Sequence, residues 1–225
     1  MDNESLMLTI AVLGGTGKEG KGLAYRWAKA GYRVLIGSRV SERAVTVASE
    51  IMQLLEGSSS VVGTTNLEAA KQAEIIVLTV PYAAHRATLE SVRDALKDKL
   101  LIDATVPLVP PKKTKVQMPP AGSAVQEAKG IVGEDVQVVA AFQNISHELL
   151  FGEEDIDCDV LVTGTSKAGR AEALRLVDAA GLTGWDAGPI ENSVVVEGLA
   201  SVLININRQY GSTHAGIRIT CVSRS

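Results

Sequence analysis

Short apolar runs alternate with amphipathic stretches along most of the chain. Residues 6–13 form a brief apolar run without polar alternation, which predicts a buried parallel strand. Residues 18–30 follow with Leu23 and Trp27 at helical spacing, and residues 33–37 are apolar again. Together the three stretches predict one β-α-β unit.

The same alternation continues beyond this unit. It predicts further helices at 42–55, 67–73 and 85–97, and further strands at 61–64, 74–80 and 100–104. Strands that recur with helices between them are typical of a doubly wound parallel sheet with right-handed crossovers. We therefore expect an α/β protein with a Rossmann-type sheet.

A proline-rich stretch interrupts the pattern at residues 105–122. Five of the seven prolines of the chain fall there: Pro107, Pro110, Pro111, Pro119 and Pro120. Proline lacks the N–H group that helices and inner strands need, so this stretch is expected to be a loop. Loops of this length are more often functional than incidental, and we expect this one to wall a ligand.

The chain returns to helices and strands after the proline-rich loop. The pattern predicts helices at 123–129, 167–180 and 194–210 and strands at 136–141, 159–163 and 184–186. A polar segment begins at residue 142, so we expect a Rossmann domain at 1–142 and a smaller C-terminal α/β domain at 143–225. The last helix is apolar on almost all sides, which predicts burial against a domain or a second subunit.

The composition is that of an ordinary folded protein. The chain has 225 residues, of which 46% are hydrophobic and 21% charged, and it can bury a substantial core. Its formal net charge of −4 gives no general attraction to nucleic acid or to an anionic membrane, so we expect neither as a partner. Any phosphate group must therefore be bound by a local feature.

The cysteines and the N-terminal residues bear on the compartment. Cys158 and Cys221 are too few for a disulfide framework, and no cysteine or histidine cluster has metal-ligand spacing, so no metal site is expected. The chain begins with the acidic sequence MDNE where a secretory signal would be basic, and no apolar run reaches the roughly 20 residues that span a bilayer. We expect a cytoplasmic protein.

A glycine-rich turn follows the first predicted strand, with the spacing GxGxxG at Gly15, Gly17 and Gly20. In a β-α-β unit the first glycine allows the tight turn, the second lets a pyrophosphate approach the backbone, and the third lets helix and strand pack closely. Backbone N–H groups at the helix start then face the phosphates. A turn that is merely tight is the alternative, but the strand, the helix and the spacing together favour a dinucleotide site.

The end of the second predicted strand bears on which dinucleotide binds. An NAD site usually carries an Asp or Glu about 20 residues beyond the glycines to hold the ribose hydroxyls. This chain has Gly37, Ser38 and Arg39 there, with Arg43 one helical turn further on. Hydroxyl and guanidinium donors suit a 2′-phosphate, so the sequence favours NADP. The alternative is that both arginines are solvated surface residues.

The carboxyl ends of later strands are the candidates for the reactive end, because the ligand of such a sheet crosses them. Thr79, Val80 and Pro81 end one predicted strand and are expected beside the nicotinamide half of the nucleotide. Pro81 could equally do no more than end the strand. Asp103 ends the next strand, where it could be a buried cap or a base.

No acid–base set is visible in the sequence. His85, His147 and His214 are scattered without a recognisable partner, and each is expected to be a helix-start or surface residue. Oxidation of an alcohol requires a base for the hydroxyl proton, whereas hydride exchange between two organic cofactors requires mainly that two rings lie face to face. We therefore expect direct hydride transfer with no catalytic side chain.

Six segments carry a family resemblance. They are LGGTG at 13–17 with KGLA at 21–24, GSR at 37–39, VLTVP at 77–81, VPLVP at 106–110, AGP at 187–189 and AGIRIT at 215–220. Together they resemble the NADPH-dependent coenzyme F420 reductases, also called F420H2:NADP oxidoreductases. The resemblance extends over nearly the whole chain.

This resemblance implies a homodimer whose Rossmann domain binds NADP and whose smaller domain helps to enclose the deazaflavin of coenzyme F420. Hydride would pass directly between nicotinamide C4 and deazaflavin C5. The residues implied at the nucleotide are Thr16, Lys18 and Glu19 for the pyrophosphate and Ser38, Arg39 and Arg43 for the 2′-phosphate. Those implied at the deazaflavin are Gln143, Asn144 and Ile145, with the start of the long helix.

The long helix departs from the family pattern. Family members carry an arginine near Val194 and a threonine near Ala200, and one form has a serine near Gly198. These apolar or bare positions leave two alternatives open. One is an NADPH-dependent reductase of another small acceptor, such as a flavin, a metal chelate or an imine, and the other is a non-catalytic NADP-binding redox sensor.

Overall fold

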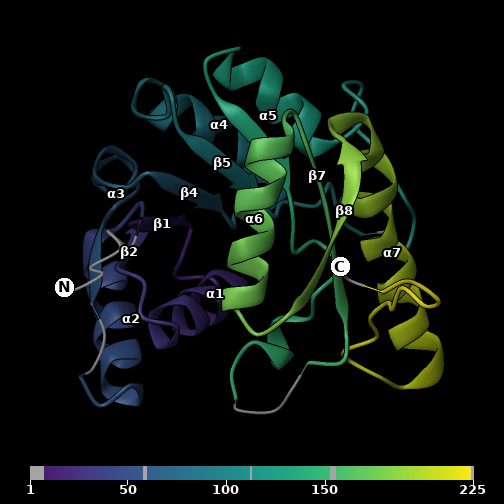
Figure 1. Ribbon diagram of the computed structural model, residues 1–225, viewed down its shortest axis with the longest axis horizontal. Helices are drawn as coiled ribbons and strands as arrows, with labels where there is room; N and C mark the ends of the chain where they lie inside the picture. The colour runs from purple at the N-terminus through teal and green to yellow at the C-terminus, as the bar shows by residue number, and fades with distance from the viewer. Residues whose placement is uncertain (1–7, 58–59, 112, 153–155, 224–225) are drawn as a thin grey trace.

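The computed structural model describes residues 8–57, 60–111, 113–152 and 156–223, and its strands within these ranges form one sheet (Figure 1). Leu6 and Met7 of the first predicted strand lie outside the described residues. The strands are β1 Ile10–Leu13, β2 Val34–Ser38, β3 Val61–Thr65, β4 Ile75–Leu78, β5 Leu100–Asp103, β6 Gln137–Ala140, β7 Asp159–Gly164 and β8 Thr183–Pro189.

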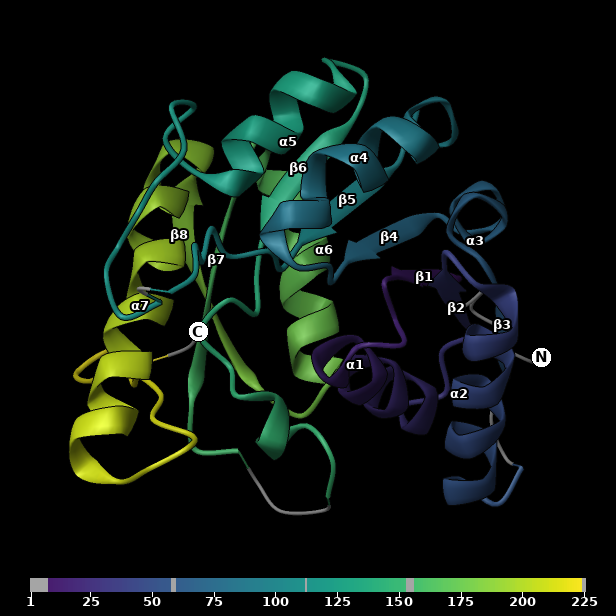
Figure 2. The same ribbon diagram turned by 180° about the vertical axis from the view of Figure 1, so that it is seen from behind.

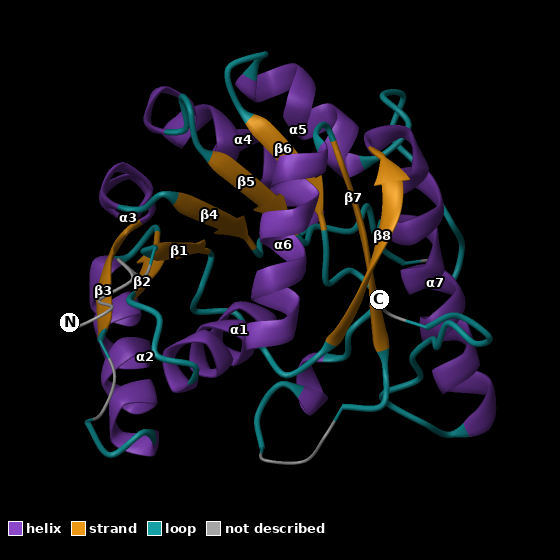
Figure 3. Ribbon diagram, viewed as in Figure 1, coloured by secondary structure: helices purple, strands orange, loops and turns teal. Residues whose placement is uncertain are grey.

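The order of these strands confirms a Rossmann-type sheet. It runs β3-β2-β1-β4-β5-β6-β7-β8, and every neighbouring pair from β3 to β6 is parallel (Figure 3). From β1 the chain adds β2 and β3 on one side, and from β4 it adds the later strands on the other side. Leu13 lies opposite Leu78 where β1 and β4 pair. Because the strand order reverses there, the β1–β4 pair is the switch point at which such sheets bind ligands.

Helices cover both faces of the sheet. Their bounds are α1 Lys18–Lys29, α2 Ser41–Leu54, α3 Asn66–Gln72, α4 Tyr82–Val92, α5 Ala124–Val132, α6 Lys167–Ala179 and α7 Ser193–Tyr210. Helices α1, α2 and α6 share one core with Val12 of β1, and α3, α4 and α5 share the other with Leu13 (Figure 2). Successive residues of a strand point to opposite faces of the sheet. A strand whose residues are all apolar therefore contributes side chains to the core on each face.

The last two strands run against the others. Strand β7 is antiparallel to β6, and β8 is parallel to β7. The described residues between β6 and β7 contain a short 3-10 helix, η2 (His147–Leu149), but no α-helix. A parallel neighbour needs a long crossover, usually a helix, so without one the chain turns back along its own sheet. The parallel order expected from the sequence thus holds from β3 to β6.

Helix α1 joins the N-terminal half to segments beyond the expected domain boundary. The indole N–H of Trp27 donates to the carbonyl of Leu176 at 2.9 Å in the buried core. The guanidinium of Arg26 donates to the carbonyls of Leu149 and Ala180. The sheet also crosses that boundary through the β6–β7 pairing. A division into two domains at this point stays a prediction.

Helix α7 is buried on one face. Val196 and Leu203 are buried, while Val195 and Val202 are 64% and 45% exposed. The single chain therefore covers only part of a helix that the sequence predicts to be buried. Among the described residues, no helix has the length and apolar character needed to cross a bilayer.

Candidate functional site

The turn between β1 and α1 has the backbone that the glycine motif requires. Gly14 has a φ of +74°, in the left-handed region that favours glycine. A Cβ atom on Gly20 would lie 2.8 Å from the Cα atom of Gly15, so the helix can approach the turn only without a side chain there. Helix α1 begins at Lys18 with Gly17 as its N-cap. Its first N–H groups have no side-chain cap, and they can face an anion.

A groove of about 230 Å³ opens at the β1–β4 switch point. Its lining comes from the carboxyl ends of the strands and the starts of the helices that follow them. Eight predicted residues meet in this lining: Thr16, Gly17, Ser38, Arg39, Arg43, Thr79, Val80 and Pro81. Of the other predicted loop residues, Gly15 and Gly20 are buried in the turn, and Lys18 is exposed at the start of α1.

The cationic end of this groove is open. Arg39 and Arg43 are exposed, and neither forms a hydrogen bond or ion pair with a described residue. Ser38 is buried, and its Oγ accepts a hydrogen bond from the N–H of Val40 at 3.2 Å, which leaves its hydroxyl proton to donate elsewhere. The described lining contains no carboxylate. Two unpaired guanidinium groups beside a hydroxyl donor fit a phosphate monoester.

Asn66 is a residue of this groove that the sequence analysis did not name. It begins α3, and its Oδ1 accepts a hydrogen bond from the N–H of Gly14 at 3.3 Å. The buried side chain therefore supports the glycine turn from the start of α3. The sequence could have indicated Asn66, because it follows directly on β3. Ligands of such sheets bind at the carboxyl ends of the strands, which is also why Thr79 was selected.

A second cavity, of about 330 Å³, also borders the start of α1. Gln143, Asn144 and Ile145 line it, as predicted for the second ligand. The proline-rich loop contributes Val106 and Leu108 to its wall. The rest of the described lining comes from Glu19, Ser146, His147, Ala200, Leu203, Ile204, Asn207, Thr213 and Ala215.

Polar atoms without protein partners gather at this cavity. Oε1 of Gln143, Oδ1 of Asn144 and Nε2 of His147 are buried and accept or donate no hydrogen bond in the described structure. The amide nitrogens are engaged, because Gln143 donates to the carbonyl of Asp103 and Asn144 to that of Asp159, each at 2.6 Å. Buried polar atoms without partners are costly. Three residues of one cavity lining thus carry polar atoms that a polar occupant could satisfy.

Glu19 borders the second cavity from the start of α1. It belongs to the first turn of α1 and lines the second cavity, whereas the resemblance implies a place at the pyrophosphate. Gly17, two residues earlier, lines the groove. Burial, with a further contribution from the charge of Asp103, raises the pKa of Glu19 to about 8. The start of α1 thus presents backbone N–H groups to one space and a protonatable carboxyl to the other.

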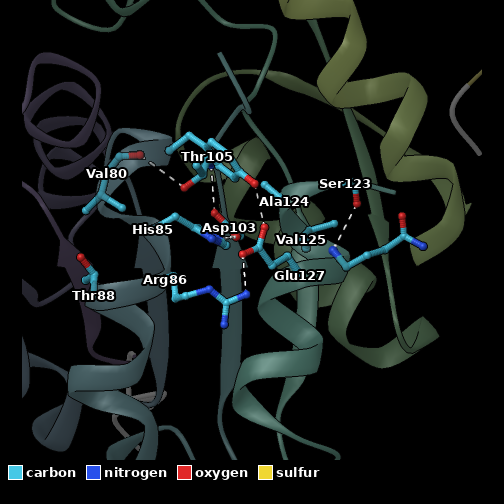
Figure 4. Close-up of polar contacts among 12 residues, drawn as sticks. Val80, His85, Arg86, Thr88, Asp103, Thr105, Ser123, Ala124, Val125 and Glu127 are labelled. Atoms are coloured by element: carbon cyan, nitrogen blue, oxygen red, sulfur yellow. Dashed lines mark hydrogen bonds and ion pairs between the residues drawn. The ribbon is translucent and has the colours of Figure 1, made fainter. Parts of the chain in front are cut away.

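Behind the groove, His85 in the first turn of α4 points toward Asp103 at the end of β5 (Figure 4). Nε2 of His85 lies 2.7 Å from Oδ2 of Asp103, and both side chains are buried. Burial lowers the pKa of His85, but the hydrogen bond and charge of Asp103 outweigh it and raise the pKa above its usual value. His85 is therefore a helix-start residue, as expected, with a buried partner that the sequence did not reveal.

The three positions at which the long helix departs from the family pattern fall in different surroundings. Val194 is 38% exposed. A Cβ atom on Gly198 would lie 3.3 Å from Cε of Met118, so this position faces the proline-rich loop. Ala200 lines the second cavity. The wall of that cavity therefore comes from the middle of α7, and the resemblance placed the start of the helix there.

The two spaces suit different groups. The groove offers N–H and guanidinium donors, which fit the phosphates of a dinucleotide. The second cavity combines apolar side chains such as Leu108 and Leu203 with the free carbonyl oxygens of Gln143 and Asn144. That combination fits a flat ring system with an apolar edge and an edge that carries N–H groups, as in a deazaflavin. Among the described residues, no three His, Cys, Asp or Glu side chains are grouped to hold a metal ion.

Comparison with known proteins agrees with this geometry. Residues 9–107 match a family model described as NADP oxidoreductase coenzyme F420-dependent. The chain is 40% identical over 220 residues to an F420-dependent NADP reductase of Methanothermobacter marburgensis, covering 95% of this chain and 98% of that protein. It is 34% identical over 221 residues to the F420-dependent NADP reductase of Methanocaldococcus jannaschii, covering 95% and 98% of the two chains.

A solved structure extends the similarity to the fold. A crystal structure from Arthrobacter sp. FB24, described as that of a candidate F420-dependent NADP-reductase, superposes with a TM-score of 0.78 at 26% identity and covers 95% of this chain and 99% of its own. The sequence relatives span the length of the chain, and this structure spans its fold. The chain therefore belongs to the family of F420-dependent NADP reductases, NADP-dependent oxidoreductases whose two cofactors are NADP and coenzyme F420.

Proposed function

We propose that the groove binds NADP, that the second cavity binds the deazaflavin of F420, and that hydride passes directly between the two rings at the start of α1. The observation that carries this proposal is the position of the start of α1: Gly17 lines one space, and Glu19, two residues later, lines the other. Two organic rings in adjoining spaces need mainly to be held in the right mutual orientation for hydride transfer.

At the nucleotide, each predicted group has a place in this proposal. The glycine turn and the start of α1 receive the pyrophosphate, the cluster after β2 receives the 2′-phosphate, and the end of β4 lies beside the nicotinamide. For the pyrophosphate the residues are Gly15, Thr16, Gly17, Lys18 and Gly20. For the 2′-phosphate they are Ser38, Arg39 and Arg43. For the nicotinamide they are Thr79, Val80 and Pro81. The unpaired guanidinium groups support the choice of NADP over NAD.

At the deazaflavin, Gln143 and Asn144 supply fixed carbonyl oxygens for N–H groups of the ring, and Ile145 packs against it. The support is that both amide nitrogens already donate to backbone carbonyls, which orients the oxygens. Ala200 and Leu203 contribute the apolar wall from α7.

We further infer a cytoplasmic homodimer in which the exposed face of α7 meets a second copy. Val195 and Val202 support the interface, because apolar side chains exposed side by side are common where subunits meet. Cys158 and Cys221 are free thiols, which suits a reducing compartment.

The test is turnover of NADPH with coenzyme F420 by the purified protein. We expect F420 reduction and no comparable rate with free flavin in its place. Absence of turnover with the deazaflavin, together with turnover of a flavin or an imine, would assign the second cavity to another acceptor.

A variant in the second cavity separates the two sites. Ala200→Phe places a large ring in the proposed deazaflavin space, and overpacking of about 1–3 kcal/mol should weaken F420 binding roughly tenfold to a hundredfold. The Kd for NADP should stay at the wild-type value, because Ala200 is absent from the described lining of the groove. Loss of both affinities in parallel would count against two separate spaces.

A further inference from the structure

The exchange of hydride between NADPH and F420 also consumes a proton. Written in full, NADPH, F420 and H⁺ give NADP⁺ and F420H2, so the balance requires one proton for each hydride. A positioned side chain with a pKa near the working pH can supply it. The described lining of the second cavity holds two titratable side chains, Glu19 and His147.

Glu19 is free to carry that proton. Its carboxyl group forms no hydrogen bond or ion pair with any described residue, although it is half-buried. Two other acids are engaged by contrast: Glu50 pairs with Lys21 at 2.5 Å, and Glu197 accepts two backbone hydrogen bonds. A half-buried carboxyl group in the lining of the second cavity, without a partner among the described residues, is available to a ligand.

The charged groups around Glu19 favour its neutral form. Asp103 at the end of β5 acts on it directly, and that aspartate is paired with His85 of α4. Glu197 of α7 adds negative charge around the same pair, and His147 of η2 lines the same cavity. Burial first, and the charge of Asp103 second, raise the pKa of Glu19 to about 8. At neutral pH the carboxyl group therefore holds a proton.

We propose that Glu19 is the proton carrier of the reaction: its carboxyl group donates a proton to the deazaflavin when hydride leaves NADPH, and takes it back in the reverse direction. This inference rests on the proposed placement of the two cofactors. In the forward direction the O–H bond of Glu19 breaks and an N–H bond forms on the reduced ring. The carboxylate that remains lies near the positive charge of oxidised nicotinamide, which stabilises it. Solvent then restores the proton.

The charge of Glu19 should therefore follow the redox state of the nucleotide, and binding measurements can detect this. We expect the ratio of the Kd for NADP⁺ to the Kd for NADPH to fall as the pH rises through about 8, because an ionised Glu19 favours the cationic ring. The fall is at most about tenfold per pH unit for one proton. Titration of the 2′-phosphate is common to both ligands and cancels in the ratio.

Glu19→Gln keeps the size and polarity of the side chain and removes the titration, so its Kd ratio should be flat across this range. Glu68→Gln is the matched control, because Glu68 is an exposed acid on α3 whose carboxyl group pairs with Lys71 at 2.9 Å. This control should keep the wild-type pH dependence. His147→Gln should also keep it, since His147 is the other titratable residue of the cavity.

The kinetic counterpart uses F420 reduction across the same pH range. Wild-type kcat should fall above about pH 8 as Glu19 loses its proton. Glu19→Gln should lower kcat roughly a hundredfold, the lower end for loss of a general acid, and should lack this fall.

A Glu19→Gln enzyme that keeps the pH dependence of the wild-type Kd ratio and of kcat would overturn the inference. Loss of that pH dependence in His147→Gln would overturn it as well. The proposed function fails on a different observation. If the wild-type protein does not reduce F420 at all, the assignment of the second cavity is wrong, whatever Glu19→Gln does to the nucleotide affinities.

Discussion

His85 and Asp103 form a buried pair between the first turn of α4 and the end of β5. Nε2 of His85 lies 2.7 Å from Oδ2 of Asp103, and Oδ1 of the same carboxylate accepts a hydrogen bond from the N–H of Thr105 at 2.9 Å. The pair ties the first turn of α4 to the end of β5 (Figure 4). Since α4 follows directly on Pro81, the pair also holds the end of β4 that borders the groove.

The first prediction concerns stability against pH. The fold raises the pKa of His85 above 6.5, so the stabilisation from its protonated form is fully present below about pH 6.5 and is lost as the pH rises through the higher folded value. His85→Gln keeps a donor for Asp103 but does not titrate. Urea unfolding at several pH values should show that the stability advantage of wild type over this variant shrinks as the pH rises. A constant difference would mean that folding leaves the pKa of His85 unchanged.

The amino-acid sequence predicted much of the sheet and many of the residues that line the groove, but it could not predict this pair. The groove residues follow from local signals: glycine spacing marks the turn, and Arg39 comes at the end of a strand. His85 and Asp103 become partners only because α4 packs against β5, and no periodicity records that contact. Glu19 was missed as a cavity residue for a related reason, because the direction of a side chain at the start of a helix depends on what packs around it.

The second prediction concerns the choice between NADP and NAD. Replacing Arg39 and Arg43 together by alanine should raise the Kd for NADP by roughly two decades or more and leave the Kd for NAD almost unchanged. Each charge-assisted hydrogen bond to the 2′-phosphate contributes about 1.5–3 kcal/mol where water is partly excluded. Calorimetric titration measures both constants. Arg175→Ala, an exposed arginine on α6, is the control, and equal losses for both nucleotides in the double variant would refute the selectivity.

The third prediction separates a glycine that is required from one that is not. Gly20→Ala should destabilise the protein and weaken NADP binding, because the new methyl group would lie 2.8 Å from the Cα atom of Gly15. Gly130→Ala in α5 is the matched control, since a Cβ atom there meets nothing within 4 Å. Alanine in a helix interior should stabilise that variant by about 0.5–1 kcal/mol. Thermal unfolding with and without NADP measures both, and a Gly20→Ala protein with unchanged NADP affinity would contradict the packing argument.

The β6–β7 reversal illustrates a second limit of sequence analysis. Residues 142–157 are polar and mixed, and the sequence predicted a domain boundary there without assigning a strand direction beyond it. The direction of β7 depends on whether a helix connects it to β6. That direction decides where Gln143 and Asn144 meet α7 and the residues after it, such as Thr213. The second cavity is thus built by topology and by contacts distant in sequence, which explains why the resemblance was needed to name its residues.

The last prediction concerns the buried carboxylate of α7. Glu197 is fully buried, and its two oxygens accept hydrogen bonds from the N–H groups of Ala124 and Val125 at 2.7 and 3.0 Å. These N–H groups open α5 and have no partner within their own helix. Glu197→Ala leaves both N–H groups buried and unpaired, which should lower the free energy of unfolding by about 1–3 kcal/mol for each group. Glu197→Gln retains one acceptor, so its free energy of unfolding should fall by about half as much.

The pH dependence distinguishes this account from simple loss of packing at Glu197. Burial raises the pKa of Glu197 to about 8, with the two N–H groups opposing the shift, so wild-type stability should fall as the pH rises from about 4.5 toward 8. Glu197→Gln lacks that dependence, and its deficit relative to wild type should narrow with rising pH in urea unfolding. Glu191→Ala, an exposed acid just before α7, should stay within about 0.5 kcal/mol of wild type. A Glu197→Ala protein as stable as this control would show that water satisfies the start of α5.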